Sequence, residues 1–233
     1  MRNLIYRCKL LLKVIFLVFS AISLSYAAPC YGTRMPKQKN IFMGLQNFNI
    51  LKRNLENSEG KVRSMQNFLL LSYGWTDWFS IDLKGGLGNI KVHPESSGEI
   101  DYPAAFAGGY GFRVRVIDAD KIKAVAGFQH ISVHPQDIFI GDSKNEAILD
   151  DWQLSFLISR DFGRITPYMG IKLSRTDYIH RVDSTRKRVM SDLTRDVGGV
   201  IGLDIPVNER MWVNIEGQDL DSKAVALSIN MSF

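Results

Sequence analysis

Cysteine is scarce in this sequence, which holds only Cys8 and Cys30 among its 233 residues. The leader described below contains Cys8, so its removal excludes an intrachain disulfide. Histidine is also scarce, and His93, His134 and Cys30 lack the spacing of a metal-binding set. No Gly-rich phosphate loop opens a helix, because the glycines after Lys84 lie at the end of an expected strand. We therefore expect no metal site and no cofactor.

Long apolar runs are missing except near the N-terminus, where residues 14–24 follow four basic residues and precede the small residues Ser25 and Ala27. A run of that length is short of the roughly 20 residues that a membrane-spanning helix needs. The pattern predicts a cleaved secretory signal peptide over residues 1–27. Residues 28–40 carry two prolines and no periodicity, and we predict a periplasmic tail in which Cys30 is a mobile free thiol.

A strong net charge is also missing from the mature chain. The leader holds four of the 29 basic residues and no acidic one, which leaves 25 basic residues against 24 acidic ones. The remaining net charge of +1 is too small to attract a polyanion by the field of the whole protein. We expect no nucleic-acid partner.

After residue 40 the chain lacks a sustained helical period, and apolar residues recur instead with period two over segments of about ten residues. Short and long connections alternate between these segments, as in transmembrane barrels. The pattern predicts an all-β domain over residues 41–233, a closed antiparallel up-and-down transmembrane β-barrel of ten strands, with eight as the alternative. The expected strands are 41–51, 62–74, 78–89, 102–117, 122–134, 147–160, 165–180, 190–205, 210–219 and 223–233.

One face of these strands is apolar and the other is polar or glycine-rich. A soluble lipocalin-type barrel has the same period with the faces reversed, but the aromatic residues near the short turns favour a membrane barrel, in which the apolar face meets lipid and the polar face fills a narrow lumen. Charges of both signs in such a lumen should pair across it and plug it, because unpaired buried charges are costly. The predicted lumen network is Asp82, Lys84, Arg113, Arg115, Lys172, Asp204 and Glu216. Aromatic residues near the short turns predict an interfacial girdle of Tyr73, Trp75, Trp78, Phe162, Trp212 and Phe233.

The last eleven residues alternate strictly and end on an aromatic residue, with an apolar face of Val225, Leu227, Ile229, Met231 and Phe233. This strand resembles the closing strand and assembly signal of bacterial outer-membrane β-barrels. Segments 71–81 and 165–170 look like the periplasmic hairpins of small OmpA-like and opacity-type barrels. The resemblance implies a monomer in the cell outer membrane, with barrel-assembly machinery, lipid and lipopolysaccharide as partners. Members of these families include adhesins, small channels, lipid-modifying enzymes and proteins of no known activity.

One pattern raises the possibility of catalysis. His130 and Ser132 lie two apart on an expected strand, so their side chains share its lipid-facing side. The pair resembles the His-x-Ser of lipid A deacylases, which implies Ser132 as nucleophile, His130 as base and Glu146 or Asp142 as orienting acid. The sequence departs from that family, because residues 133–135 replace its Asn-Ala and the strand lies in the middle of the chain.

Two charged groups lie at the predicted outer rim. Asp150, Asp151, His180 and Asp183 resemble the acidic and histidine set of omptin proteases, but adjacent aspartates on a strand point to opposite faces, which favours a solvated rim. The basic group is a candidate lipopolysaccharide-phosphate site or a solvated charge run; it comprises Arg181, Arg186, Lys187 and Arg188.

We therefore expect a structural or surface-interaction role without catalysis, through the outer loops at 52–61, 90–101, 135–146 and 181–189. A narrow small-solute channel is the second hypothesis. A lipid A deacylase-like hydrolase that uses His130 and Ser132 is the third.

Overall fold

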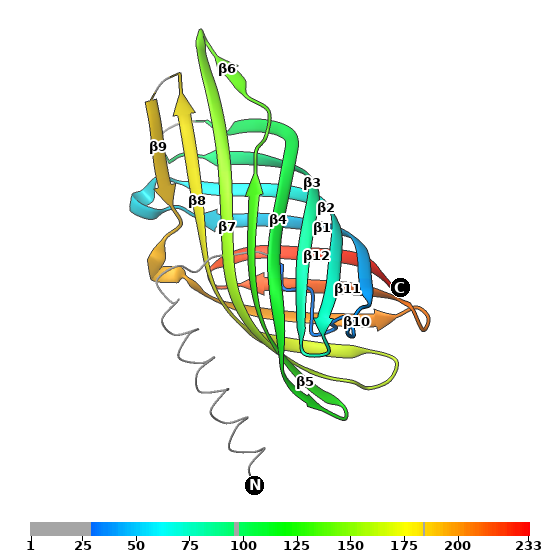
Figure 1. Ribbon diagram of the computed structural model, residues 1–233. Coiled ribbons are helices and arrows are strands. Elements are labelled where there is room, and N and C mark those ends of the chain that lie inside the picture. The colour runs from blue at the N-terminus through cyan, green and yellow to red at the C-terminus, as the bar shows by residue number, and fades with distance from the viewer. Residues whose placement is uncertain (1–28, 96–97, 184) are drawn as a thin grey trace.

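The computed structural model describes residues 29–95, 98–183 and 185–233, so the predicted signal peptide lies outside the described residues. Ten antiparallel strands wrap into a closed barrel (Figure 1), which confirms the predicted fold. Pairing of the first strand with the last and of β7 with β8 closes the wall. The barrel strands are β1 (Ile41–Asn54), β2 (Lys61–Thr76), β3 (Phe79–His93), β4 (Ile100–Ala119), β5 (Ile122–Val133), β7 (Ser143–Arg160), β8 (Thr166–Val182), β10 (Val197–Pro206), β11 (Met211–Asp219) and β12 (Ser222–Ser232).

Two further strands stand outside the closed wall. β6 (Ile138–Ile140) pairs with β7, and β9 (Thr185–Met190) pairs with β8, so that four strands form an extension at the long-loop end. The regions 135–146 and 181–189, expected as loops, are therefore largely hairpins. The strand expected at 190–205 begins only at Val197, because the chain first turns through a short 3-10 helix, η2 (Leu193–Arg195).

The rim of the barrel is uneven in height. Strands β4, β7 and β8 have 20, 18 and 17 residues, whereas β10, β11 and β12 have 10, 9 and 11. A tilted strand needs about 9–11 residues to cross a bilayer. The length of β7 and β8, whose ends reach the top of Figure 1, is therefore more than a bilayer crossing needs, while β11 and β12 are only long enough to cross.

The outer surface is apolar over the height of a bilayer. On β12, the side chains of the predicted apolar face are all exposed: Val225 44%, Leu227 49%, Ile229 51%, Met231 36% and Phe233 58%. Five of the six predicted girdle aromatics are also exposed. The sixth, Trp212, was assigned wrongly: it is 6% exposed and packs edge-on against Phe42 at 4.8 Å, because alternation on β11 turns it inward.

The interior differs between its two ends. Buried charged and amide side chains fill the half next to the short turns. Toward the long loops, a cluster of buried apolar residues, including Phe48, Ile90, Tyr102 and Leu149, lies beside further buried charges such as Arg53 and Asp177. The outer half of the interior is therefore mixed, and the expectation of a polar interior throughout is wrong there. In the described part of the chain, no helix has the length and apolarity needed to cross a membrane.

Candidate functional site

The N-terminal segment expected as a periplasmic tail lies inside the barrel. Cys30, Tyr31 and Thr33 are each less than 5% exposed. The backbone N–H of Cys30 donates to Oε1 of Glu216 at 2.9 Å, and the Thr33 and Ser159 hydroxyls are 2.6 Å apart. Cys30 is consequently a buried thiol and not a mobile one. The segment supplies polar partners that the inward-facing charges would otherwise lack.

Tyr31 joins this segment to two inward-facing cations. Its ring centroid lies 4.1 Å from Nζ of Lys84 and 4.9 Å from Cζ of Arg113, so the ring makes a cation–π contact with each. Nη1 of Arg113 also donates to the carbonyl oxygen of Arg34 at 2.6 Å. These contacts hold the segment across the lumen.

Arg113 and Asp82 form a buried, two-pronged ion pair. Nε of Arg113 donates to Oδ2 of Asp82 at 2.9 Å and Nη2 donates to Oδ1 at 3.0 Å. Lys84, two residues along β3, donates to Oε1 of Gln129 at 3.0 Å. Paired hydrogen bonds of this kind offset the cost of removing both charges from water.

A second cluster surrounds Asp221, which the sequence analysis did not single out. Nη1 of Arg53 lies 2.6 Å from its Oδ2, and Nζ of Lys172 lies 2.9 Å from the same oxygen. Strict alternation along β1 would place Arg53 outside, but a bulge between Ile50 and Lys52 turns it inward. Arg53 was missed because the expected strand ended at residue 51, whereas β1 continues to Asn54. The bulge adds a change of orientation that alternation does not reveal.

The third cluster lies around Glu216. Tyr168 donates its hydroxyl to Oε2 of Glu216 at 2.8 Å, and Asn214 donates to Oδ1 of Asp204 at 2.8 Å. Arg115, the remaining member of the predicted lumen network, lies at the short-turn rim and pairs with Asp118, which is 50% exposed.

These groups are shielded from bulk solvent. Asp82, Lys172, Asp204 and Glu216 are each at most 1% exposed. Buried polar groups and the apolar cluster thus fill the lumen over the described residues. This arrangement opposes the passage of hydrated solutes.

The predicted deacylase residues do not come together. The His130 ring packs on Trp152, with centroids 3.8 Å apart, and Glu146 pairs instead with Lys144 at 2.8 Å and Arg181 at 2.9 Å. Those two cations lower the pKa of Glu146, with the Lys144 hydrogen bond as the larger cause. Hydrogen bonds to Asp137 and Glu146 raise the pKa of Lys144 to about 12.

Ser132 has a different histidine neighbour. Its Oγ lies 2.9 Å from Nε2 of His134 and donates its proton to Oδ1 of Asp150. With that proton given to the carboxylate, Nε2 of His134 must itself be the donor to Oγ. A general base would need the opposite arrangement, with an unprotonated nitrogen that accepts the serine proton. The geometry therefore holds Ser132 as a structural hydrogen-bonding group.

The acidic and histidine residues of the rim are also separate. Asp150 bonds Ser132 on the outer face, whereas Asp151 accepts from Thr176 inside the barrel. His180 bonds Asn145 at 3.0 Å. The omptin-like set is thus not assembled as one site.

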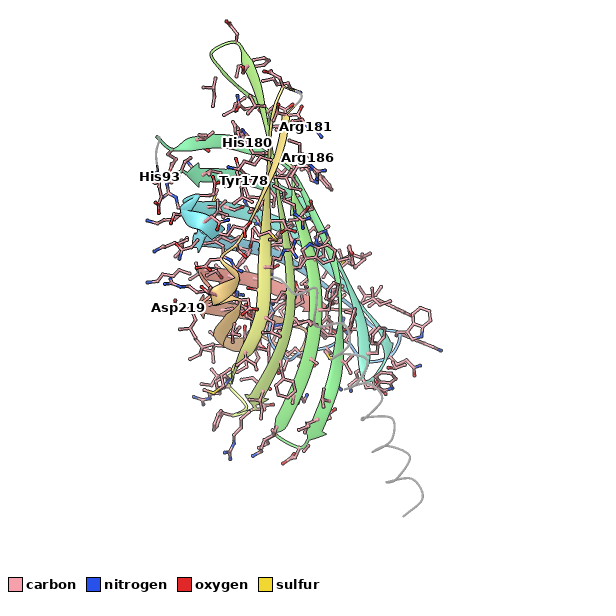
Figure 2. The ribbon with its side chains drawn as sticks, turned by 90° about the vertical axis from the view of Figure 1, so that its left-hand side faces the viewer. His93, Tyr178, His180, Arg181, Arg186 and Asp219 are labelled. Carbon is pink, nitrogen blue, oxygen red and sulfur yellow. The ribbon has the colours of Figure 1, made fainter. Side chains whose placement is uncertain are left out.

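The basic group lies on the hairpin of β8 and β9, where Figure 2 shows His180, Arg181 and Arg186. Arg181 pairs with Glu146, Lys187 with Glu59 at 2.6 Å, and Arg188 with Asp177. Three of the four predicted phosphate ligands thus already have carboxylate partners. Their attraction for an external anion is correspondingly weakened.

The tip of the neighbouring hairpin is apolar. Phe139 is 72% exposed and Ile140 is 49% exposed, directly before Gly141, whose φ of 61° makes the turn. This tip projects beyond the long-loop rim (Figure 1). Among the described residues, no group of three or more His, Cys, Asp or Glu side chains could hold a metal ion.

A closed antiparallel wall, an apolar outer band and a filled polar interior define the chain as a β-barrel of the transmembrane class. No protein-family model matches the sequence, and no curated protein matches it significantly.

Among solved structures, the transport unit of the autotransporter AIDA-I from Escherichia coli is 10% identical with a TM-score of 0.45, over 89% of this chain and 93% of that chain. The outer membrane protease OmpT from Escherichia coli is 12% identical with a TM-score of 0.43, over 87% and 97%. The outer membrane protein OprG from Pseudomonas aeruginosa is 8% identical with a TM-score of 0.42, over 86% and 98%.

Proposed function

We propose that this chain is a monomeric outer-membrane barrel with a surface-interaction role, in which the extension of β6 to β9 presents a binding surface outside the cell. The observation that carries the proposal is the exposed apolar tip at Phe139 and Ile140 on the hairpin that β6 forms with β7. Exposed apolar side chains that project from a surface are typical of protein-binding sites. The C-terminal strand would be recognised by the barrel-assembly machinery during insertion.

The interior supports a role without transport or catalysis. Channels keep a continuous aqueous path, whereas here buried ion pairs and an apolar cluster fill the lumen. The proton arrangement at Ser132 opposes a nucleophilic role. Planar-bilayer recordings of the folded protein should therefore be silent.

Display of the protein on a bacterial laboratory strain tests the surface role. Binding of these cells to immobilised epithelial cells, matrix proteins and lipopolysaccharide would be compared for the wild type and a Phe139→Ser/Ile140→Ser variant. Loss of two apolar anchors should weaken binding about tenfold or more. Val207→Ser is the matched control, because Val207 is 60% exposed in a turn at the opposite end.

The control variant should bind as the wild type does. Absence of binding to every surface by correctly folded wild-type protein would refute the proposal, as would equal binding by the tip variant.

A further inference from the structure

A hollow interrupts the lipid-facing surface on the low side of the barrel, over β8, β10, β11 and β12. It is an open depression of about 910 Å³. Phe156, Ile171 and Ile201 line one side, and Leu51 and Val225 line the other. The surface of this hollow is almost entirely apolar, so it suits hydrocarbon.

Two glycines on the outer face form the floor of the hollow. A Cβ atom at Gly199 would meet nothing closer than Leu220 at 3.8 Å, and one at Gly217 nothing closer than Ile201 at 3.9 Å. Neither glycine is needed for close packing, so side chains could have filled this space. Leu220 adds an unusual feature, since it adopts a φ of 82° and is 72% exposed beside the hollow. Such a conformation is costly for a leucine and is found at functional positions.

Two lysines lie near the outer end of the hollow, of which Lys223 lines it. Lys52 and Lys223 are cross-strand partners on β1 and β12, and both are exposed. The bulge that turns Arg53 inward leaves Lys52 outside, next to Lys223. Like charges opposite each other repel, and an anion between them relieves that repulsion. The nearby carboxylate of Asp221 is turned into the interior and is occupied by Arg53 and Lys172.

The lysines lie at the height of lipid head groups. Ten residue steps separate Lys223 from Phe233 in the periplasmic girdle, and at about 3.4 Å per step and a tilt of about 40° they rise roughly 25 Å. That is the height of the apolar band of an outer-membrane barrel. The short β11 and β12 therefore bring the lysine pair to the outer interface, directly above the hollow.

We infer that this hollow and the lysine pair bind one molecule of lipopolysaccharide, with a lipid A phosphate on Lys52 and Lys223 and an acyl chain over Gly199 and Gly217. An outer-leaflet lipid that is both phosphorylated and acylated matches the charge above and the apolar groove below. The inference rests on the proposed location in the outer membrane and not on the role of the β6 hairpin. Asp219, which also borders the hollow and is labelled in Figure 2, reduces the local positive charge.

Native mass spectrometry of the mature chain refolded in a neutral detergent tests the site. Deep-rough lipopolysaccharide should bind with one molecule per barrel, and Lys52→Ala/Lys223→Ala should weaken it about ten- to thirtyfold. Gly217→Leu, which fills the groove, should also weaken binding. Asp219→Asn should strengthen it. Heat-modifiable gel mobility would establish that each variant is folded.

The controls distinguish this site and this lipid from others. Lys37→Ala/Lys39→Ala, which removes two exposed lysines at the short-turn end, should leave binding unchanged. Dephosphorylated lipopolysaccharide and phosphatidylglycerol should each bind at least about tenfold more weakly than the intact glycolipid. Unchanged binding by folded Lys52→Ala/Lys223→Ala, or equal binding of phosphatidylglycerol, would overturn the assignment.

Discussion

Replacing Arg113 with methionine should destabilise the barrel by about 3–5 kcal/mol, because it leaves a buried carboxylate without its counter-charge. Asp82 is 0% exposed and accepts two hydrogen bonds from Arg113, at 2.9 and 3.0 Å. The substitution also removes the 2.6 Å hydrogen bond to the carbonyl oxygen of Arg34 and the contact with the Tyr31 ring. The inserted segment should therefore loosen together with the ion pair.

A double-mutant cycle isolates the ion pair from these other contacts. Asp82→Leu leaves Arg113 buried but still bonded to Arg34, so it should cost less than Arg113→Met. The double variant should be more stable than the sum of the single changes predicts, by about 2–3 kcal/mol, because two apolar side chains replace two charges.

Urea unfolding in detergent, followed by tryptophan fluorescence, measures these free energies. Arg115→Met is the matched control, since Arg115 lies two residues along β4 and pairs with the half-exposed Asp118. That change should cost less than Arg113→Met, because Arg115 pairs with a half-exposed carboxylate and makes only a long hydrogen bond of 3.5 Å to the carbonyl oxygen of Met35 in the inserted segment. The reasoning would be refuted if the two single substitutions changed the free energy of unfolding additively. It would also be refuted if Arg113→Met lowered that free energy no more than Arg115→Met does.

Three further outcomes are expected. The Cys30 thiol, which is 2% exposed, should resist a maleimide reagent in the folded mature chain and react fully after denaturation; rapid labelling of folded protein would contradict the inserted segment. Gly202→Ala should cost about 1–3 kcal/mol, because its Cβ would lie 2.2 Å from Cζ of Tyr168, whereas Gly199→Ala on the open outer face should change stability by less than about 0.5 kcal/mol. The wild type and the Ser132→Ala variant should both release acyl chains from lipopolysaccharide only at the background rate. A rate above background that only the wild type shows would establish the enzyme hypothesis.

Local alternation predicted the strands of the barrel wall and divided each into an apolar and a polar face, because successive side chains point to opposite sides. It did not decide which face is outside, since a soluble barrel has the same period with the faces reversed. The alternating short and long connections and the aromatic residues near the short turns favoured the apolar face as the outer one. Asp82, Lys84 and Glu216 were placed in the lumen for the same reason.

The partners of those charges were decided by the tertiary structure. Arg53 and Asp221 meet across 168 residues of sequence, and they do so only because β1 and β12 close the barrel and a bulge reverses the orientation of Arg53. The N-terminal segment has no periodicity that predicts its position. It lies in the lumen because inward-facing side chains of the closed wall, such as Glu216 and Arg113, form hydrogen bonds with its backbone.

The sequence by itself therefore determined the strands and their two faces, since these depend on neighbours two residues apart. Barrel closure decided which groups meet inside, how high each side of the rim stands, and where Lys52 and Lys223 converge above an apolar hollow. Those features depend on distant strands packing around one interior, and no local pattern contains them.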